Sequence, residues 1–144
     1  MNERIVRRAL GANAVFSLCT GVSLLLFASS LGPRLGVHPA WVLQVIGAAL
    51  VPFGLGVAFV AKQKPLRASW VAAISLMDAG WVVGTLMLAL FWPGVMNQVG
   101  WTATVVVALF VDAFCIAQLV GLRRLTATPN AAEAQKCAGV STSR

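Results

Sequence analysis

Charge is the scarcest property of this chain. Of its 144 residues only 10% are charged, against 59% that are hydrophobic, and just four are acidic. In a soluble domain about a quarter of the residues are charged, so these proportions exclude an ordinary soluble fold. They indicate a membrane protein whose main surroundings are the lipid bilayer.

Residues suited to metal, redox or catalytic chemistry are equally few. The chain has no Tyr and one His, and its three cysteines, Cys19, Cys115 and Cys137, show no paired spacing. This pattern excludes a disulfide framework and leaves a metal site nothing to build on, so we expect no metal and no other cofactor. No nucleophile and base pair or phosphate-binding loop is visible, and we do not expect an enzyme, although paired carboxylates could in principle perform acid–base chemistry.

Long apolar runs are what the sequence does contain. Four of them occupy about residues 10–31, 40–61, 68–92 and 99–122. Each reaches the roughly 20 residues that cross a bilayer, and a chain without water around it must satisfy its backbone as helix. Short connections rich in Pro and Gly force neighbouring helices to be antiparallel. Residues 1–125 are therefore predicted to be an all-α membrane domain, an up-down bundle of four transmembrane helices.

The placement of the basic residues predicts the orientation of these helices. Ten of the eleven Lys and Arg residues fall on one side of the predicted membrane, and Arg34 alone falls on the other. The positive-inside rule then puts both termini in the cytoplasm. The net charge of +7 thus reflects topology and contact with lipid headgroups, and no nucleic-acid partner is expected. Residues 126–144 are small, polar and aperiodic, which predicts a disordered cytoplasmic tail.

Two of the four acidic residues lie inside the apolar runs. Asp78 is eleven residues after Arg67, and Asp112 is eleven residues before Arg123. At 1.5 Å per residue, both should lie ~16 Å into the membrane, close to its centre. Because residues 68–92 and 99–122 form a hairpin, we expect the two carboxyl groups at one level.

Other polar residues converge on the same level. Asn13, Ser17 and Thr20 are spaced as i, i+4 and i+7, which aligns them on one face of the first helix. Ser75 shares a face with Asp78 on the third helix in the same way. These polar faces predict a polar layer near the membrane centre.

Two further residues belong to this prediction. Trp81 follows Asp78 by three residues and so lies on nearly the same face, deep in the third helix, where we expect it to pack in the core, with contact to a ligand as the alternative. Gln118 lies at about the depth of Asn13, and we expect it to hydrogen-bond across helices.

A midplane carboxyl pair has a functional and a structural interpretation. An ionised Asp at a helix centre costs roughly 2.5 to 3.5 kcal/mol, and no Lys or Arg lies within the apolar runs to offset it. At least one proton should therefore be held near neutral pH, and a group poised in this way can bind and release a proton or a cation. A protonated Asp can equally serve as a structural hydrogen-bonding group, at ~0.6 kcal/mol per contact.

The functional interpretation is a small proton- or cation-coupled transporter or permeation protein. Its path would use Asp78, Asp112, Trp81, Thr20 and Ser75. The alternative is a noncatalytic accessory subunit or scaffold of a larger membrane complex, with the aspartates as structural groups.

Gly80 and Gly84 form a GxxxG pattern on the third helix. By helical rotation they should face roughly opposite Asp78. They would then offer a packing surface to residues 40–61 or to another subunit. We therefore expect either a homo-oligomer or a membrane-protein partner.

Three short stretches carry a resemblance to known proteins. They are Asn13-Ala-Val-Phe-Ser17 after a basic N-terminus, the pair Asp78-x-x-Trp81, and the ending Gln118-Leu-Val-Gly-Leu-Arg-Arg124. In these the chain resembles small bacterial four-helix integral membrane proteins of uncharacterised function. The resemblance implies a bacterial inner membrane and no defined activity. Small multidrug transporters also have four helices, but the glutamate within their first helix has no counterpart here.

Overall fold

The computed structural model is all-helical. It describes the backbone of residues 2–141 and the side chains of residue 4 and residues 6–120. Its elements are the helices α1 (Asn2–Leu35), α2 (Trp41–Lys62), α3 (Ala68–Phe91) and α4 (Gln98–Ser141), with a short 3-10 helix, η1 (Pro93–Val95), before α4.

Each of the four α-helices contains a segment long and apolar enough to cross a membrane. These segments are Val6–Leu35, Trp41–Lys62, Ala68–Phe91 and Gln98–Val120. The ends of the second and third agree with the predicted runs to within one residue. The prediction of four helices of transmembrane length is therefore confirmed.

The outer helices α1 and α4 are longer than their apolar runs. α1 begins at Asn2, eight residues before the run, and so includes the basic residues that precede it. α4 continues to Ser141, whereas composition predicts a disordered tail over residues 126–144. The added segment contains several alanines, the residue with the highest helix propensity. Residues 142–144 of the expected tail lie outside the described residues.

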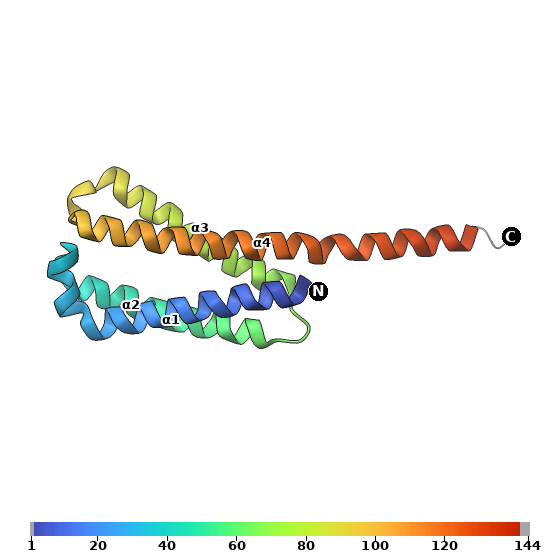
Figure 1. The fold of residues 1–144 in the computed structure, drawn as a ribbon, viewed down its shortest axis with the longest axis horizontal. Helices are drawn as coiled ribbons and strands as arrows, with labels where there is room; N and C mark the ends of the chain where they lie inside the picture. The colour runs from blue at the N-terminus through green and yellow to red at the C-terminus, as the bar shows by residue number, and fades with distance from the viewer. Residues whose placement is uncertain (1, 142–144) are drawn as a thin grey trace.

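The helices are arranged as two hairpins, α1 with α2 and α3 with α4 (Figure 1). α1 packs against both α2 and α4, and α3 packs against α4, whereas α2 and α3 barely touch. The α1–α2 and α3–α4 connections lie at one end of the four-helix part, and the start of α1 and the α2–α3 connection lie at its other end, beyond which α4 continues alone (Figure 1). The end that contains the start of α1 and the α2–α3 connection is called the basic end.

Glycines bring α1 and α2 unusually close. A Cβ atom added to Gly47 would lie 2.6 Å from the carbonyl oxygen of Gly21, and one added to Gly54 would lie 2.8 Å from Leu18 Cγ. Such contacts leave no room for a side chain, so the backbones pack directly against each other. Small residues serve this purpose in membrane helices, where apolar burial gives little driving force between helices.

Asn97 ties the two hairpins together at the end opposite the basic end. Its Oδ1 accepts a 2.9 Å hydrogen bond from the backbone N–H of Gly100, which caps the start of α4, and its Nδ2 donates to the carbonyl oxygen of Arg34 at 2.9 Å. Gly36, in the left-handed conformation with φ 74°, ends α1. A Cβ atom at Gly36 would lie 2.5 Å from the Asn97 nitrogen, so this close approach requires glycine.

Arg7 makes the corresponding tie at the basic end. Its Nη1 donates a 2.5 Å hydrogen bond to the carbonyl oxygen of Ala61, and its Nη2 donates to that of Gln63. Carbonyl groups at the end of α2 lack partners within the helix and carry partial negative charge, which a guanidinium group satisfies. The start of α1 is thus fixed to the end of α2.

Candidate functional site

Five polar side chains are buried between the hairpins in one layer. They come from three helices and are at most 5% exposed: Asn13 and Ser17 on α1, Ser75 and Asp78 on α3, and Gln118 on α4. Buried polar groups are costly unless they are paired, so their partners show how the layer is built.

Asp78 is held by an asparagine on another helix. Asp78 is only 3% exposed, and its Oδ2 accepts a 2.7 Å hydrogen bond from Asn13 Nδ2. Ser17 Oγ donates to Asn13 Oδ1 at 3.3 Å from the next turn of α1. The predicted polar face of α1 therefore points at Asp78 and fixes its carboxyl group.

Gln118 joins α4 to the same layer. Its Oε1 accepts a 3.0 Å hydrogen bond from Ser75 Oγ, which confirms the expectation that Gln118 hydrogen-bonds across helices. Its side chain also lies beside the Asp78 carboxyl group, yet Nε2, although buried, has no hydrogen-bond partner in the described part of the chain. The layer therefore brings a second amide group, that of Gln118, next to Asp78.

The register of α3 and α4 sets Asp78 and Asp112 at one level. Cys115 Sγ approaches the carbonyl oxygen of Ser75 at 3.6 Å, which makes these two residues level on antiparallel helices. Asp78 follows Ser75 by three residues and Asp112 precedes Cys115 by three, so both lie the same distance from that level.

Asp112 is nevertheless exposed on the outside of the four helices and does not meet Asp78. Within residues 110–120 of α4 the buried positions are Val111, Cys115 and Gln118, spaced as i, i+4 and i+7. Asp112 follows the first of these by one residue, a rotation of about 100°, which turns it away from the interior. The expected pair of carboxyl groups is therefore not formed within one chain, and the interior site contains Asp78 alone.

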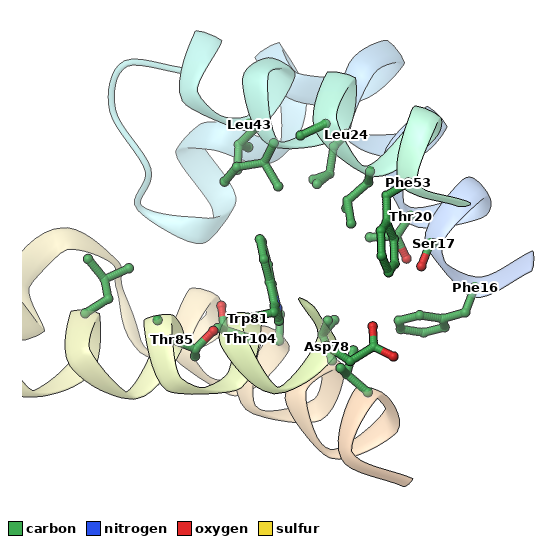
Figure 2. Close-up of a pocket in the computed structure, with 18 of the residues that line it drawn as sticks. Phe16, Ser17, Thr20, Leu24, Leu43, Phe53, Asp78, Trp81, Thr85 and Thr104 are labelled. Carbon is green, nitrogen blue, oxygen red and sulfur yellow. The ribbon is translucent and has the colours of Figure 1, made fainter. Parts of the chain in front are cut away.

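A cavity of about 570 Å³ lies between the hairpins (Figure 2). All four α-helices contribute to its lining, which is mostly apolar. It forms because α2 and α3, on facing sides of it, make almost no contact with each other. The polar side chains along it are Ser17, Thr20, Asp78, Thr85 and Thr104.

Trp81 extends from α3 into this cavity, toward α1 and α2 (Figure 2). It is 38% exposed, so its ring is not a packed core side chain of this chain. Phe16 lines the same cavity, and its ring contacts those of Phe110 and Phe114. The cavity thus combines one carboxyl group with aromatic surfaces.

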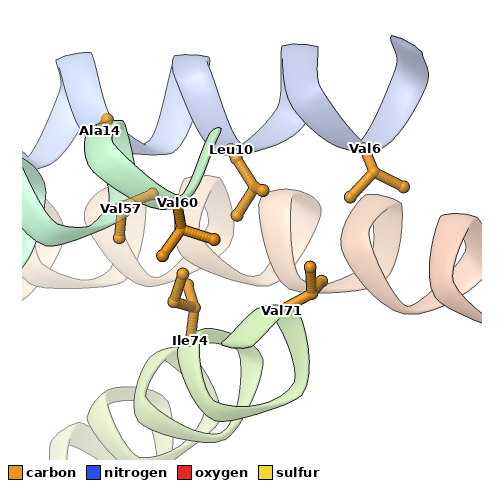
Figure 3. Packing of buried hydrophobic residues seen from close by; sticks show 7 residues of the cluster. All are labelled: Val6, Leu10, Ala14, Val57, Val60, Val71 and Ile74. Atoms are coloured by element: carbon orange, nitrogen blue, oxygen red, sulfur yellow. The ribbon is translucent and has the colours of Figure 1, made fainter. Parts of the chain in front are cut away.

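A cluster of aliphatic side chains packs between the cavity-lining residues and the basic end (Figure 3). Val6 and Leu10 of α1 meet residues of α2 and α3 there, and all of them are buried. The full cluster consists of Val6, Leu10, Ala14, Val57, Val60, Val71 and Ile74. Asp78 lies one turn beyond Ile74 on α3, so its carboxyl group stands between this cluster and the cavity. The cluster is called the basic-end seal below.

The remaining predicted site residues divide between the cavity and the polar layer. Thr20 lines the cavity, whereas Ser75 is buried in its bond to Gln118 and does not line it. No group of three or more His, Cys, Asp or Glu side chains suited to a metal occurs among the described residues.

Gly80 and Gly84 lie elsewhere than expected. Both line the cavity with Asp78, so they do not form a separate packing face behind it. A Cβ atom on either would meet nothing within 4 Å. They face α2 across open space, and the close helix packing of this protein is made by Gly21, Gly47 and Gly54.

Sequence comparison adds no relative from which a role could be transferred. No protein-family model, no curated protein and no solved structure matches this chain. Any functional assignment therefore depends on the geometry of the site itself.

Proposed function

We propose that this protein is a small transporter or permeation protein of a bacterial inner membrane, in which a proton or a cation binds at Asp78. One observation carries the proposal: a largely apolar cavity ends at a single buried carboxyl group. Ionisable groups within membrane segments are rare, and they commonly mark the pathway of a substrate or an ion. The bacterial location rests on the resemblance in short motifs.

The orientation we propose has both termini in the cytoplasm, with the four helices crossing the membrane as an up-down bundle. Five basic side chains support it, since they are exposed at the basic end: Arg4, Arg8, Lys62, Lys64 and Arg67. Arg34 is near the opposite end. Under the positive-inside rule the basic end faces the cytoplasm.

Transport requires that Asp78 become accessible from both sides. The basic-end seal separates Asp78 from the proposed cytoplasmic side, while the cavity reaches it from the other direction. Separation of the two hairpins at the seal would expose Asp78 to the cytoplasm. The seal itself consists of aliphatic side chains. The hydrogen bond from Asn13 to Asp78 joins the same two hairpins, so it would have to open together with the seal.

Flux measurements on proteoliposomes test this proposal. Purified protein should move protons or a monovalent cation down an imposed gradient, and Asp78→Asn should reduce the flux to the level of protein-free liposomes. Asn keeps the size of the side chain and an oxygen that can accept the bond from Asn13, so the change is confined to ionisation. Flux that is unchanged in a folded Asp78→Asn protein contradicts the proposal.

Asp112 supports self-association as part of the proposed function. A carboxyl group near the membrane centre should not face hydrocarbon, and such residues almost always face a protein interior or water. Asp112 is exposed among the apolar side chains of Val105, Leu109 and Ile116. A second copy packed on this face of α4 would cover it.

The alternative proposal is a noncatalytic accessory subunit. The open space above Gly80 and Gly84 supports it, because a helix of a larger complex could enter between α2 and α3. Purification in mild detergent should then recover a partner in fixed stoichiometry, and Gly84→Leu should lose it. An enzymatic role has less support than either proposal.

A further inference from the structure

We propose that the cavity binds a lipophilic organic cation, a largely apolar molecule that carries one positive charge. The charge would lie at Asp78 and the apolar body against Trp81. This inference rests on the proposed transport function, because it names the class of molecule that the same site would carry.

The size and lining of the cavity indicate how large the ligand is and that most of its surface is apolar. A volume of about 570 Å³ is within the range of 300–1,000 Å³ that small-molecule sites occupy. Aliphatic and aromatic side chains make up most of the lining, so a strongly polar molecule would lose its hydration without replacement there. The sparse contact between α2 and α3 leaves a side through which an apolar molecule could enter from the bilayer.

The charge of the residues that line the cavity indicates the sign of the ligand's charge. Asp78 is its one ionisable residue, and no Lys, Arg or His is among the residues that line the cavity. An anionic ligand would place like charges together in a medium of low dielectric constant, whereas a cation would compensate the carboxylate. Complementary charge therefore favours a cation.

Two amide groups prepare Asp78 to be the anionic partner. Asn13 Nδ2 donates to its Oδ2, and the fully buried Gln118 brings its side-chain amide beside the same carboxyl group. N–H donors stabilise a carboxylate through charge-assisted hydrogen bonds. Because both donors come from the polar layer, the cavity side of the carboxyl group is left for the ligand.

Aromatic rings add a second attraction for a cation. Trp81 projects into the cavity (Figure 2), and Phe16 is also among the residues that line it. The faces of such rings attract organic cations, and Trp does so most strongly. A ligand that reaches Asp78 would pass these faces.

Two probes of the same shape and opposite charge test the inference, namely tetraphenylphosphonium and tetraphenylborate. Calorimetric titration of the full chain in detergent should show that the phosphonium binds about tenfold or more tightly than the borate. Asp78→Asn should abolish that preference. Equal binding of the two ions, or a preference that persists in Asp78→Asn, would overturn the inference.

A cavity-filling variant covers the case in which Asp78→Asn does not fold. A Cβ atom at Gly84 meets nothing within 4 Å, so Gly84→Leu places its side chain in the cavity without touching the bond between Asn13 and Asp78. It should weaken phosphonium binding about tenfold or more. Gly56→Leu is the matched control, because Gly56 is equally open but does not line the cavity. Undiminished binding in folded Gly84→Leu contradicts the proposed site.

Flux and binding together separate the two proposals. Charge-selective binding that depends on Asp78, without any flux that depends on it, would support the ligand class and reject transport. Flux that depends on Asp78, without charge-selective binding, would support transport and reject the ligand class.

Discussion

Asn13 Nδ2 donates a 2.7 Å hydrogen bond to Asp78 Oδ2. This bond joins α1 to α3, two helices that contact each other through their side chains. It is the link that positions the one carboxyl group of the interior. The two residues are 65 positions apart in the chain and come from different hairpins. The stability of the site and the relative placement of the hairpins are therefore coupled.

Replacing Asn13 should destabilise the protein more than replacing its neighbour Ser17. Asn13→Leu removes the donor to Asp78, and buried interhelical hydrogen bonds in membrane proteins contribute roughly 0.6 to 1.7 kcal/mol. Ser17→Ala removes only the 3.3 Å bond to Asn13 within α1. The free energy of unfolding in mixed lipid and detergent micelles measures both. A smaller loss in Asn13→Leu than in Ser17→Ala would show that the bond to Asp78 does not matter for stability.

Gly47→Ala should destabilise the α1–α2 hairpin. Its new Cβ atom would lie 2.6 Å from the Gly21 carbonyl oxygen, and overpacking of this kind typically costs about 1–3 kcal/mol. Gly56→Ala on the same helix is the control, because its Cβ atom meets nothing within 4 Å. Both changes gain the same helix propensity, so the difference between their unfolding free energies isolates the contact. Equal stability of the two variants would contradict the close packing at Gly47.

Asp112→Leu should weaken self-association. The substitution removes the carboxyl group that a second copy would cover and leaves an apolar side chain that lipid can solvate. The loss of each interhelical hydrogen bond should lower the association constant about threefold. Energy transfer between labelled chains in lipid vesicles measures this constant. Asp112→Asn, which keeps hydrogen-bonding groups, should associate nearly as the native chain does, and unaltered association in Asp112→Leu would reject this interface.

The sequence allowed the helices and the relative level of Asp78 and Asp112 along them to be predicted, because both follow from hydropathy and a rise per residue that is the same in every helix. It did not allow the rotation of α4 to be predicted. The polar residues Asp112 and Gln118 of that helix fall on different faces, so they do not mark which side is lipid and which is interior. Asp112 was consequently expected inside, where Gln118 and Cys115 lie.

The same difficulty affected the glycines. Gly80 and Gly84 match a familiar packing pattern, but close approach depends on the shape of the facing helix, which a single segment does not contain. The spacing of Gly47 and Gly54, seven residues apart on one face, was the available signal for the packed α1–α2 contact. The cavity could not be predicted at all, since it results from two helices that fail to meet.

A comparison of Asp78→Asn with Asp112→Asn in the proteoliposome flux assay tests the central claim most directly. The two changes are chemically identical and lie at one level of the α3–α4 hairpin, so they differ only in the side of the helices they affect. The account predicts that Asp78→Asn abolishes flux and that Asp112→Asn leaves it close to that of the native chain. Equal flux in the two variants, or a loss confined to Asp112→Asn, would contradict the assignment of the interior cavity as the functional site.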